Sequence, residues 1–520
     1  MMFFFEKSLI FVSARLIPQK LLTVTTILQK LYFSKIFKYI YFVLEFFFEL
    51  WYDIMKSFKK GNYVYRKEIN MSIKCAFVSL GCPKNLLDSE VMLAVLLKND
   101  IEIVEEDIHA DVVVVNTCAF IESAKQEAIE TILDVAWLRE NRHLKGIVVT
   151  GCLAQRYKEE IFELMPEVDA IVGVGDIEKI AEAVKYAYEN GGNREKPKYS
   201  CVTLPENSPM GGDRVVTTPE YSVYIKISEG CDNRCTYCII PYLRGKFRSR
   251  PMEDIIAEAK EMVSLGAKEI ILVSQDTTRY GLDLYGTYSL DKLLRELCKI
   301  DGIKWIRILY CYPEEITQEL VKTIAEEDKI VKYIDLPIQH ISDKVLKLMN
   351  RRGNGELIRE RIKLLRDNVP GIAIRSTVIV GFPGEGNKEF AEIAEFLKEV
   401  KFERLGVFQF SCEEGTPAAN IKEGIVSEKT KQRRYDSLMQ NQFDIHEKFN
   451  QKQVGKVLEV LCEGYDKASG VYFGRSKYDS PEIDGKVYFS SKARKIGEGE
   501  FVNVKITEVL DYDLLGEVIV

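Results

Sequence analysis

The sequence predicts an α/β protein with two successive parallel-sheet domains and a small C-terminal β-barrel. Three observations predict it. Short apolar runs alternate with helical patterns from residue 74 to about 190, and again from 221 to about 450. A stretch rich in Gly and Pro separates the two series. From about residue 451 the pattern changes to short alternating strands with Gly turns, which is typical of a small antiparallel barrel.

The length and the charge of the chain limit the number of domains and the kinds of partner that we expect, before any motif is considered. A chain of 520 residues is too long for one ordinary core, so several domains are expected. The net charge of −7 is uneven: residues 1–70 hold 11 Lys and Arg against 5 Asp and Glu, or +6, which leaves −13 for the remainder. An acidic body disfavours a nucleic-acid partner and is compatible with a basic protein partner.

The first seventy residues are unusually aromatic, holding 18 of the 55 aromatic residues of the chain. A membrane anchor is one interpretation, but charges such as Lys20, Lys30 and Glu45 interrupt the apolar runs below the roughly 20 residues that a spanning helix needs. We interpret 1–70 as an N-terminal extension outside the fold, with a natural start at Met71. We therefore expect a cytoplasmic protein without stable membrane association.

The first domain, 71–190, is predicted to be a parallel sheet with covering helices. The run from 112 to 116 is β-branched, as parallel strands buried on both faces tend to be. The pattern predicts strands at 75–80, 112–116, 146–150 and 171–173, and helices at about 88–99 and 123–141. Residues 191–220 are predicted to be a linker, because Gly and Pro interrupt any element there.

The second domain, 221–450, repeats the strand–helix pattern six times. Six units predict an incomplete (β/α)6 barrel rather than a closed barrel of eight. The expected strands are 222–227, 269–273, 305–309, 333–336, 373–380 and 405–410, with helices at 252–265, 290–299, 387–400 and 427–448. Strands of the C-terminal barrel, 451–520, are expected at 457–461, 471–474, 486–489, 501–509 and 515–520.

Three of the twelve cysteines, Cys231, Cys235 and Cys238, follow the first strand of the second domain with Cys-x3-Cys-x2-Cys spacing. Three thiolates on one tight loop hold three irons of a 4Fe–4S cube and leave the fourth iron open to a small molecule. A structural zinc site needs four protein ligands, and the cluster-binding motif of ferredoxins has Cys-x2-Cys-x2-Cys spacing. Neither alternative matches this loop.

This loop, with Tyr237 in its aromatic slot, resembles the signature of the radical S-adenosylmethionine (SAM) superfamily. The resemblance implies that the open iron binds SAM and that electron transfer cleaves it to a 5′-deoxyadenosyl radical. Ligands of such sheets bind at the carboxyl ends of strands. The positions expected to contact SAM are Tyr237, Ser274, Gln275, Asp276, Gly381 and Gly384. For the two glycines a tight turn explains the residues equally well, and a packing or capping role explains His340 at least as well as a contact with SAM.

Cys82, Cys118 and Cys152 each follow one of the first three strands of the first domain. Because the carboxyl ends of parallel strands meet at one edge of a sheet, we expect these cysteines to converge on a second cube, with Gly81 and Gly151 giving it room. Buried packing is the alternative for any single Cys. We assign that role to the remaining cysteines, Cys75, Cys201, Cys298, Cys311, Cys412 and Cys462.

Two open-site clusters in this arrangement resemble the methylthiotransferases, over roughly residues 71–520. The resemblance implies a cluster domain, a radical SAM barrel and a barrel of the TRAM type. It also implies two roles for SAM: one molecule methylates cluster-bound sulfide, and a second supplies the radical. An electron donor and a sulfur donor are expected as partners.

Within that family, some members modify a tRNA adenosine and others the β-carbon of an aspartate in protein S twelve of the small ribosomal subunit. The stretches 79–85, 272–281 and 479–488 resemble the ribosomal-protein branch. The region 450–520 holds 10 Lys and Arg against 12 Asp and Glu, whereas a module that grips tRNA should be basic. We therefore favour the ribosomal protein over tRNA. The alternatives are the tRNA branch, a non-catalytic iron–sulfur protein and a zinc-binding interaction protein.

Overall fold

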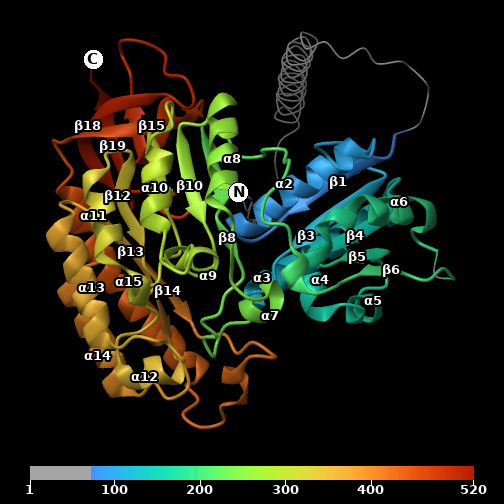
Figure 1. Cartoon of the computed structure of the whole chain (residues 1–520), viewed down its shortest axis with the longest axis horizontal. Coiled ribbons are helices and arrows are strands. Elements are labelled where there is room, and N and C mark those ends of the chain that lie inside the picture. Colours follow the sequence, from blue (N-terminus) through green and yellow to red (C-terminus); the bar gives the residue numbers. More distant parts are fainter. Residues whose placement is uncertain (1–71, 194, 520) are drawn as a thin grey trace, which may run out of the picture. The chain divides into compact units, whose positions relative to one another are not determined.

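The computed structural model describes residues 72–193 and 195–519. The predicted extension at 1–70 and the predicted start at Met71 lie outside these residues. Within them, the chain forms two six-stranded sheets, a closed five-stranded barrel and a two-stranded ribbon. The main elements follow the order that the sequence predicts (Figure 1).

The first sheet is parallel throughout, with strand order β2-β1-β3-β4-β5-β6. Its strands are β1 (Lys74–Ser79), β2 (Glu102–Ile103), β3 (Val112–Thr117), β4 (Gly146–Gly151), β5 (Ala170–Val172) and β6 (Tyr199–Cys201). Its helices are α2 (Pro83–Lys98), α3 (Glu122–Asn141), α4 (Cys152–Tyr157), α5 (Glu160–Leu164) and α6 (Ile180–Asn190).

The β-branched sequence of β3 explains why this sheet lies at the centre of its domain. All six residues of β3 are buried. Val112 and Val114 pack in the core that contains Met92 of α2, whereas Val113 packs in the core that contains Ile132 of α3. Successive strand side chains point to opposite faces, so an uninterrupted apolar run suits a strand covered on both sides.

The second sheet is also parallel, with strand order β14-β13-β12-β11-β10-β7, and it stays open. Its strands are β7 (Ser222–Lys226), β10 (Glu269–Val273), β11 (Trp305–Ile308), β12 (Ile330–Asp335), β13 (Ala373–Val380) and β14 (Arg404–Gln409). Its helices are α7 (Ile240–Arg244), α8 (Met252–Ser264), α9 (Leu282–Tyr285), α10 (Leu290–Cys298), α11 (Gln318–Glu326), α12 (Asp343–Leu348), α13 (Gly355–Asn368), α14 (Asn387–Val400) and α15 (Glu428–Gln451). The ribbon pairs β8 (Ser228–Glu229) with β9 (Arg248–Ser249).

The C-terminal strands close into a barrel in the order β15-β16-β17-β19-β18. They are β15 (Val457–Asp466), β16 (Val471–Ser476), β17 (Val487–Ser490), β18 (Phe501–Leu510) and β19 (Asp513–Val518). The prediction of an antiparallel barrel is right for every pair but one, because β17 and β19 pair in parallel.

Three further expectations need correction. The segment 191–220 is not simply a linker, because β6 pairs with β5 and extends the first sheet beyond residue 190. The helix expected at 88–99 begins earlier, at Pro83, a residue that suits the first turn of a helix. Among the cysteines assigned to packing, Cys75, Cys311 and Cys462 are buried, but Cys412 is exposed.

The C-terminal barrel covers the amino ends of the second sheet's strands. Glu269, the first residue of β10, accepts hydrogen bonds from Arg475 of β16 at 2.6 Å and from Arg307 of β11 at 3.0 Å. Trp305 at the start of β11 packs edge-on against Phe501, with ring centroids 4.7 Å apart. The C-terminal barrel therefore occupies the amino ends of these strands and not the carboxyl ends, where the predicted cofactor loops begin.

No helix within residues 72–193 and 195–519 combines the length and the hydropathy that crossing a bilayer requires.

Candidate functional site

The first three cysteines lie at the carboxyl ends of three adjacent strands. Cys82 precedes the first turn of α2 after β1, Cys118 directly follows β3, and Cys152 begins α4 directly after β4. The register brings these ends level: Ser79 pairs with Asn116, and Thr117 pairs with Gly151. The convergence expected from parallel topology is what the structure has.

Two glycines let the cysteine loops approach each other. A Cβ atom added to Gly81, whose φ is +91°, would lie 2.8 Å from the Cβ of Cys118 and 3.2 Å from its sulfur. A Cβ added to Gly151, whose φ is +89°, would lie 2.5 Å from the carbonyl oxygen of Thr117. Both positions therefore require glycine for a steric reason as well as a conformational one.

Burial and neighbouring charges act on the ionisation of two of these thiols. Burial is the main reason why the pKa of Cys118 is raised to about 12, and the neighbouring thiols of Cys152 and Cys82 contribute to that rise. Burial also raises the pKa of Cys152, which Arg244 opposes. Thiols in this state are protonated at neutral pH. A bound metal reverses that preference, because coordination deprotonates a thiol outright.

The second three cysteines share one loop between β8 and α7. Cys231 and Cys235 are buried, and Cys238 is half-buried. The amide of Cys238 donates to the carbonyl of Cys235 at 3.0 Å, so the Cys-x2-Cys part is a tight turn. The pKa of Cys231 is raised to about 11, mainly by burial, and the nearby Asp276 and Cys235 contribute to the rise. This loop also gathers three thiols in a small volume.

Both donor sets consist of three cysteines. Within the described part of the chain, no three His, Cys, Asp or Glu side chains are grouped as the ligands of one metal ion. In a cube each thiolate binds a different iron, so three thiols account for three of the four irons. Each site offers three thiols, which suits a cube with one open corner.

Three of the predicted SAM positions contact the segment that carries the second cysteine loop. Ser274 is hydrogen-bonded through its hydroxyl to Ser228. Gln275 donates to Glu229 at 2.5 Å. Asp276 accepts from Asn233, which lies between Cys231 and Cys235, at 2.7 Å. The loop after β10 is therefore held against the cysteine loop.

The other predicted SAM positions lie around Phe382, whose ring meets that of Tyr237 edge-on with centroids 6.5 Å apart. The amide of Gly381 donates to Glu385 at 2.7 Å, and the amide of Gly384 donates to the carbonyl of Gly424 at 2.8 Å. These amides have partners within the chain, which favours the turn interpretation for both glycines. Contact of these residues with SAM stays a prediction.

His340 is buried and neutral. Burial lowers its pKa to about 3, and its Nδ1 accepts from the amide of Ser342 at 3.0 Å. A turn-capping role therefore accounts for this histidine.

Sequence reasoning missed a buried ion network that joins the two cysteine sites. Arg244 of α7 pairs with Asp88 of α2, and Lys226 bridges Asp88 and Glu229 at 2.6 and 2.7 Å. Arg244 also donates to the sulfur of Cys152 at 3.6 Å. These residues are up to 156 positions apart, so no local spacing could reveal the network.

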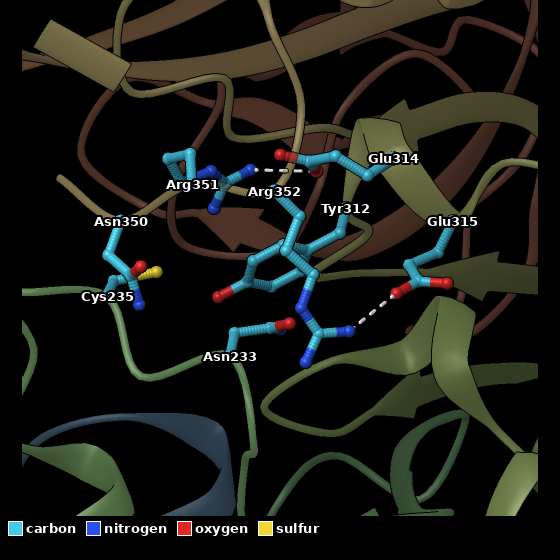
Figure 2. Close-up of a pocket in the computed structure, with 8 residues that line it drawn as sticks. All are labelled: Asn233, Cys235, Tyr312, Glu314, Glu315, Asn350, Arg351 and Arg352. Carbon is cyan, nitrogen blue, oxygen red and sulfur yellow. Dashed lines mark hydrogen bonds and ion pairs between the residues drawn. The ribbon is translucent and has the colours of Figure 1, made fainter. Parts of the chain in front are cut away.

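A polar pocket opens beside Cys235 (Figure 2). In it, Arg351 pairs with Glu314 at 3.2 Å, and Arg352 pairs with Glu315 at 3.3 Å. The guanidinium of Arg351 also lies 4.3 Å from the ring centroid of Tyr312. The pocket is lined by Asn233, Cys235, Tyr312, Glu314, Glu315, Asn350, Arg351 and Arg352. Cys235 and Asn233 place this pocket next to the second cysteine site.

Three family models match three parts of the chain, and each part lies in one of the three domains of the fold. Residues 225–397 match the Radical SAM superfamily. Residues 74–173 match the family described as Uncharacterized protein family UPF0004, and residues 454–519 match the TRAM domain.

Curated relatives match nearly the whole described region. A protein of Acetivibrio thermocellus named ribosomal protein uS12 methylthiotransferase RimO is 50% identical, over 86% of this chain and 99% of that protein. Proteins of the same name from Desulforamulus reducens and Clostridium botulinum are 50% and 48% identical, over 85% and 86% of this chain and 98% of each relative.

Solved structures agree on the fold. The radical S-adenosylmethionine methyltransferase TsrM from Kitasatospora setae, solved with cobalamin and a [4Fe-4S] cluster, superposes with a TM-score of 0.51. It is 14% identical and covers 67% of this chain and 77% of its own, a likeness of fold alone.

Proposed function

The chain belongs to the RimO family of radical SAM methylthiotransferases, and from this premise we propose that it transfers a methylthio group to ribosomal protein uS12. It is an enzyme of radical SAM chemistry that carries an iron–sulfur cluster and uses SAM. The observation that carries the proposal is the presence of two separate cysteine trios, one after three strands of the first sheet and one on the loop between β8 and α7.

The finer proposal is that each trio holds its own 4Fe–4S cube. Cys231, Cys235 and Cys238 would hold the cube that binds SAM, and Cys82, Cys118 and Cys152 would hold the other. When bound, such cubes supply one electron to SAM and an open metal position for sulfur. The position of the first trio after three adjacent strands, and of the second trio on one short loop, supports this assignment.

The chain's own residues would position these groups. The loop after β10 braces the second cysteine loop through Asn233 and Asp276, both of them buried. The buried ion pairs of Arg244 hold α7 of the second domain against α2 of the first. Rigid placement of this kind is what a protein contributes when a cofactor carries the chemistry.

We further propose that the modified group is the β-carbon of an aspartate of uS12. The proposal follows the resemblance of the stretches 79–85, 272–281 and 479–488 to the ribosomal-protein branch. The reaction then needs an electron donor and a sulfur donor as partners, because each turnover consumes an electron for the cleavage of SAM and one sulfur atom for the methylthio group.

The test is a direct substrate comparison. Enzyme reconstituted anaerobically with iron and sulfide is incubated with SAM and dithionite, together with either uS12 or tRNA, and the products are analysed by mass spectrometry. We expect a methylthio group on uS12 and none on tRNA. Methylthiolated tRNA with unmodified uS12 would assign the chain to the other branch of the family.

A second experiment, with cysteine variants, tests whether the chain is an enzyme or a non-catalytic iron–sulfur protein. We expect the wild type to form 5′-deoxyadenosine from SAM, and Cys235→Ala to abolish it. We expect Cys118→Ala to cleave SAM but to leave uS12 without a methylthio group. A wild type that cleaves no SAM after reduction would support the non-catalytic alternative.

A further inference from the structure

One short segment, 411–418, is bound to the loops of both cysteine sites. It follows β14, which forms one edge of the second sheet, whereas the loop with the second three cysteines comes after β7 at the other edge. The sheet is open, so strand pairing does not join these two edges. A segment that reaches from one edge to a loop of the other is therefore placed to fix what lies between them.

The end of this segment is bound to the second cysteine loop. The amide of Ala418 donates at 2.9 Å to the carbonyl of Thr236, which stands between Cys235 and Cys238. The side chain of Ala418 is 1% exposed and packs in one core cluster with Tyr237 of the same loop. Backbone and side chains therefore both hold the segment against this loop.

The beginning of the segment is bound to the first domain by a buried carboxylate. Glu413 is 2% exposed and pairs with Arg156 of α4 at 2.9 Å and with Lys125 of α3 at 3.1 Å. The same nitrogen of Arg156 donates at 2.9 Å to the carbonyl of Ala119, the residue after Cys118. Arg156 thus joins the Glu413 carboxylate to a loop of the first cysteine site.

A turn joins the two ends of the segment. The carbonyl of Glu413 accepts hydrogen bonds from the amide of Thr416 at 3.2 Å and from its hydroxyl at 2.7 Å. Burial acts to raise the pKa of the Glu413 carboxyl, but hydrogen bonds from Ser411, Arg156 and Lys125 outweigh burial and lower it. The carboxylate is therefore ionised at neutral pH, and the side chains of its two cations are also largely buried.

This connection is separate from the ion network of Arg244. Arg244 holds the first domain through Asp88 on the side of β7, whereas Glu413 holds it on the side of β14. A buried ion pair alone is weak evidence of a function. This pair differs because the contacts on its two sides end on the two cysteine loops. The reaction needs those loops at a fixed separation, since sulfur from one site must reach the carbon activated at the other.

We propose that the segment 411–418 is a spacer that sets the separation of the two cysteine sites, with Glu413 as its positioning residue. The inference rests on the proposed function and deepens it, because it names the contact that couples SAM cleavage at one site to sulfur transfer from the other. Glu413 acts through Arg156 on the loop of Cys118, and through the turn on Thr236.

The experiment is a double-mutant cycle with holoenzyme. It compares the wild type with Glu413→Gln, Arg156→Met and the double variant. Glu413→Asp is the conservative variant, because it keeps the charge on a shorter side chain. Glu414→Gln is the matched control, because Glu414 is the adjacent glutamate and is exposed.

Three quantities are measured. The first is the amount of 5′-deoxyadenosine formed for each methylthio group transferred to uS12. The second is the magnetic interaction between the two reduced clusters, by EPR spectroscopy. The third is hydrogen exchange of the loop that carries Cys118, by mass spectrometry. Iron content and SAM cleavage without uS12 are recorded for every variant.

We expect Glu413→Gln to form at least about 10-fold more 5′-deoxyadenosine per methylthio group, because small misplacements of reacting groups are costly. The magnetic interaction should weaken and exchange at the Cys118 loop should rise, while iron content and SAM cleavage without uS12 should match the wild type. Arg156→Met should give the same changes. The double variant should show no more than either single variant, because both remove one contact. Glu413→Asp should have a smaller effect, and Glu414→Gln none.

Proportional losses would overturn the inference. If Glu413→Gln lowered SAM cleavage and methylthio transfer by the same factor, with an unchanged magnetic interaction, the pair would serve stability alone. Additive effects in the double variant would show that Glu413 does not act through Arg156. If the wild type cleaved SAM but left uS12 unmodified, the proposed function itself would fail, whereas EPR and hydrogen exchange would still decide whether the segment is a spacer.

Discussion

At the scale of single residues, Arg244 is the physical link between the two cysteine sites. It lies six positions after Cys238, and its side chain is 2% exposed. It pairs with Asp88 and donates to the sulfur of Cys152. A hydrogen bond to a cluster sulfur is one of the means by which proteins tune a cluster. One guanidinium therefore serves both the domain interface and the predicted first cube.

Removal of this guanidinium should destabilise the folded protein. Arg244→Met leaves the buried carboxylate of Asp88 with Lys226 as its remaining partner, and we expect a loss of about 3–5 kcal/mol in the free energy of unfolding. Urea unfolding under anaerobic conditions measures it. The control is Lys363→Met, which removes an exposed pair with Asp367 and should cost about 1 kcal/mol or less. Equal costs in the two variants would contradict the account.

The sequence identified residues whose role follows from topology and missed those whose role follows from packing. Cys82, Cys118 and Cys152 were predictable because each follows a strand, and parallel strands end at one edge. Arg244 offered no such signal, because its partners come from a distant helix. The assignment of Cys412 to packing was wrong because it lies on an exposed loop after β14.

At the scale of secondary-structure elements, length decided what could be predicted. The helix at 387–400 and the strand at 373–380 were predicted with the bounds that α14 and β13 have, because both are long and strongly patterned. β6 was missed because it has only three residues, which is too short to show an alternation of apolar and polar side chains, and because the surrounding segment is rich in Gly and Pro. Its place in the sheet depends on pairing with β5, which is a tertiary effect.

The long helix α15 joins the second sheet to the C-terminal barrel through a buried histidine. His446 is 3% exposed and packs against Tyr512, with ring centroids 4.9 Å apart and the ring planes tilted by 57°. Arg404 of β14 lies 3.3 Å from its Nδ1. The pKa of His446 is lowered to about 4, mainly by burial and in part by the positive charge of Arg404. The folded protein therefore holds this imidazole neutral.

This pKa makes stability depend on pH in a defined direction. Between pH 6.5 and about 4 the unfolded chain binds a proton at His446 that the folded chain does not, so stability falls as the pH falls through that window. Between about pH 7 and pH 5, the wild type should lose about 2 kcal/mol more than His446→Gln. Urea unfolding at the two pH values measures this difference.

The glutamine variant removes the titration and retains hydrogen-bonding groups, so its own cost of substitution cancels in the comparison. His340 contributes to the pH dependence of both proteins, because burial lowers its pKa as well. Parallel stability curves for the wild type and His446→Gln would contradict the assignment of a depressed pKa to His446.

At the scale of the whole molecule, the two ends of the parallel strands have different roles in the described part of the chain. The C-terminal barrel covers the amino ends of the second sheet's strands, where Glu269 accepts hydrogen bonds from Arg475 of the barrel and from Arg307 of β11. The carboxyl ends carry the cysteine loops and meet the first domain through Lys84 and Arg244. The sequence predicted this division in outline, since ligands of such sheets bind at carboxyl ends.

The central claim is that two separate cysteine trios each hold a four-iron cube. The measurement that tests it most directly is the iron content per chain after anaerobic reconstitution. It compares the wild type with two triple-alanine variants, one for each trio. We expect about eight irons in the wild type and about four in each variant, because the sites lie on different sheets. About four irons in the wild type, or none left in one variant, would contradict the account.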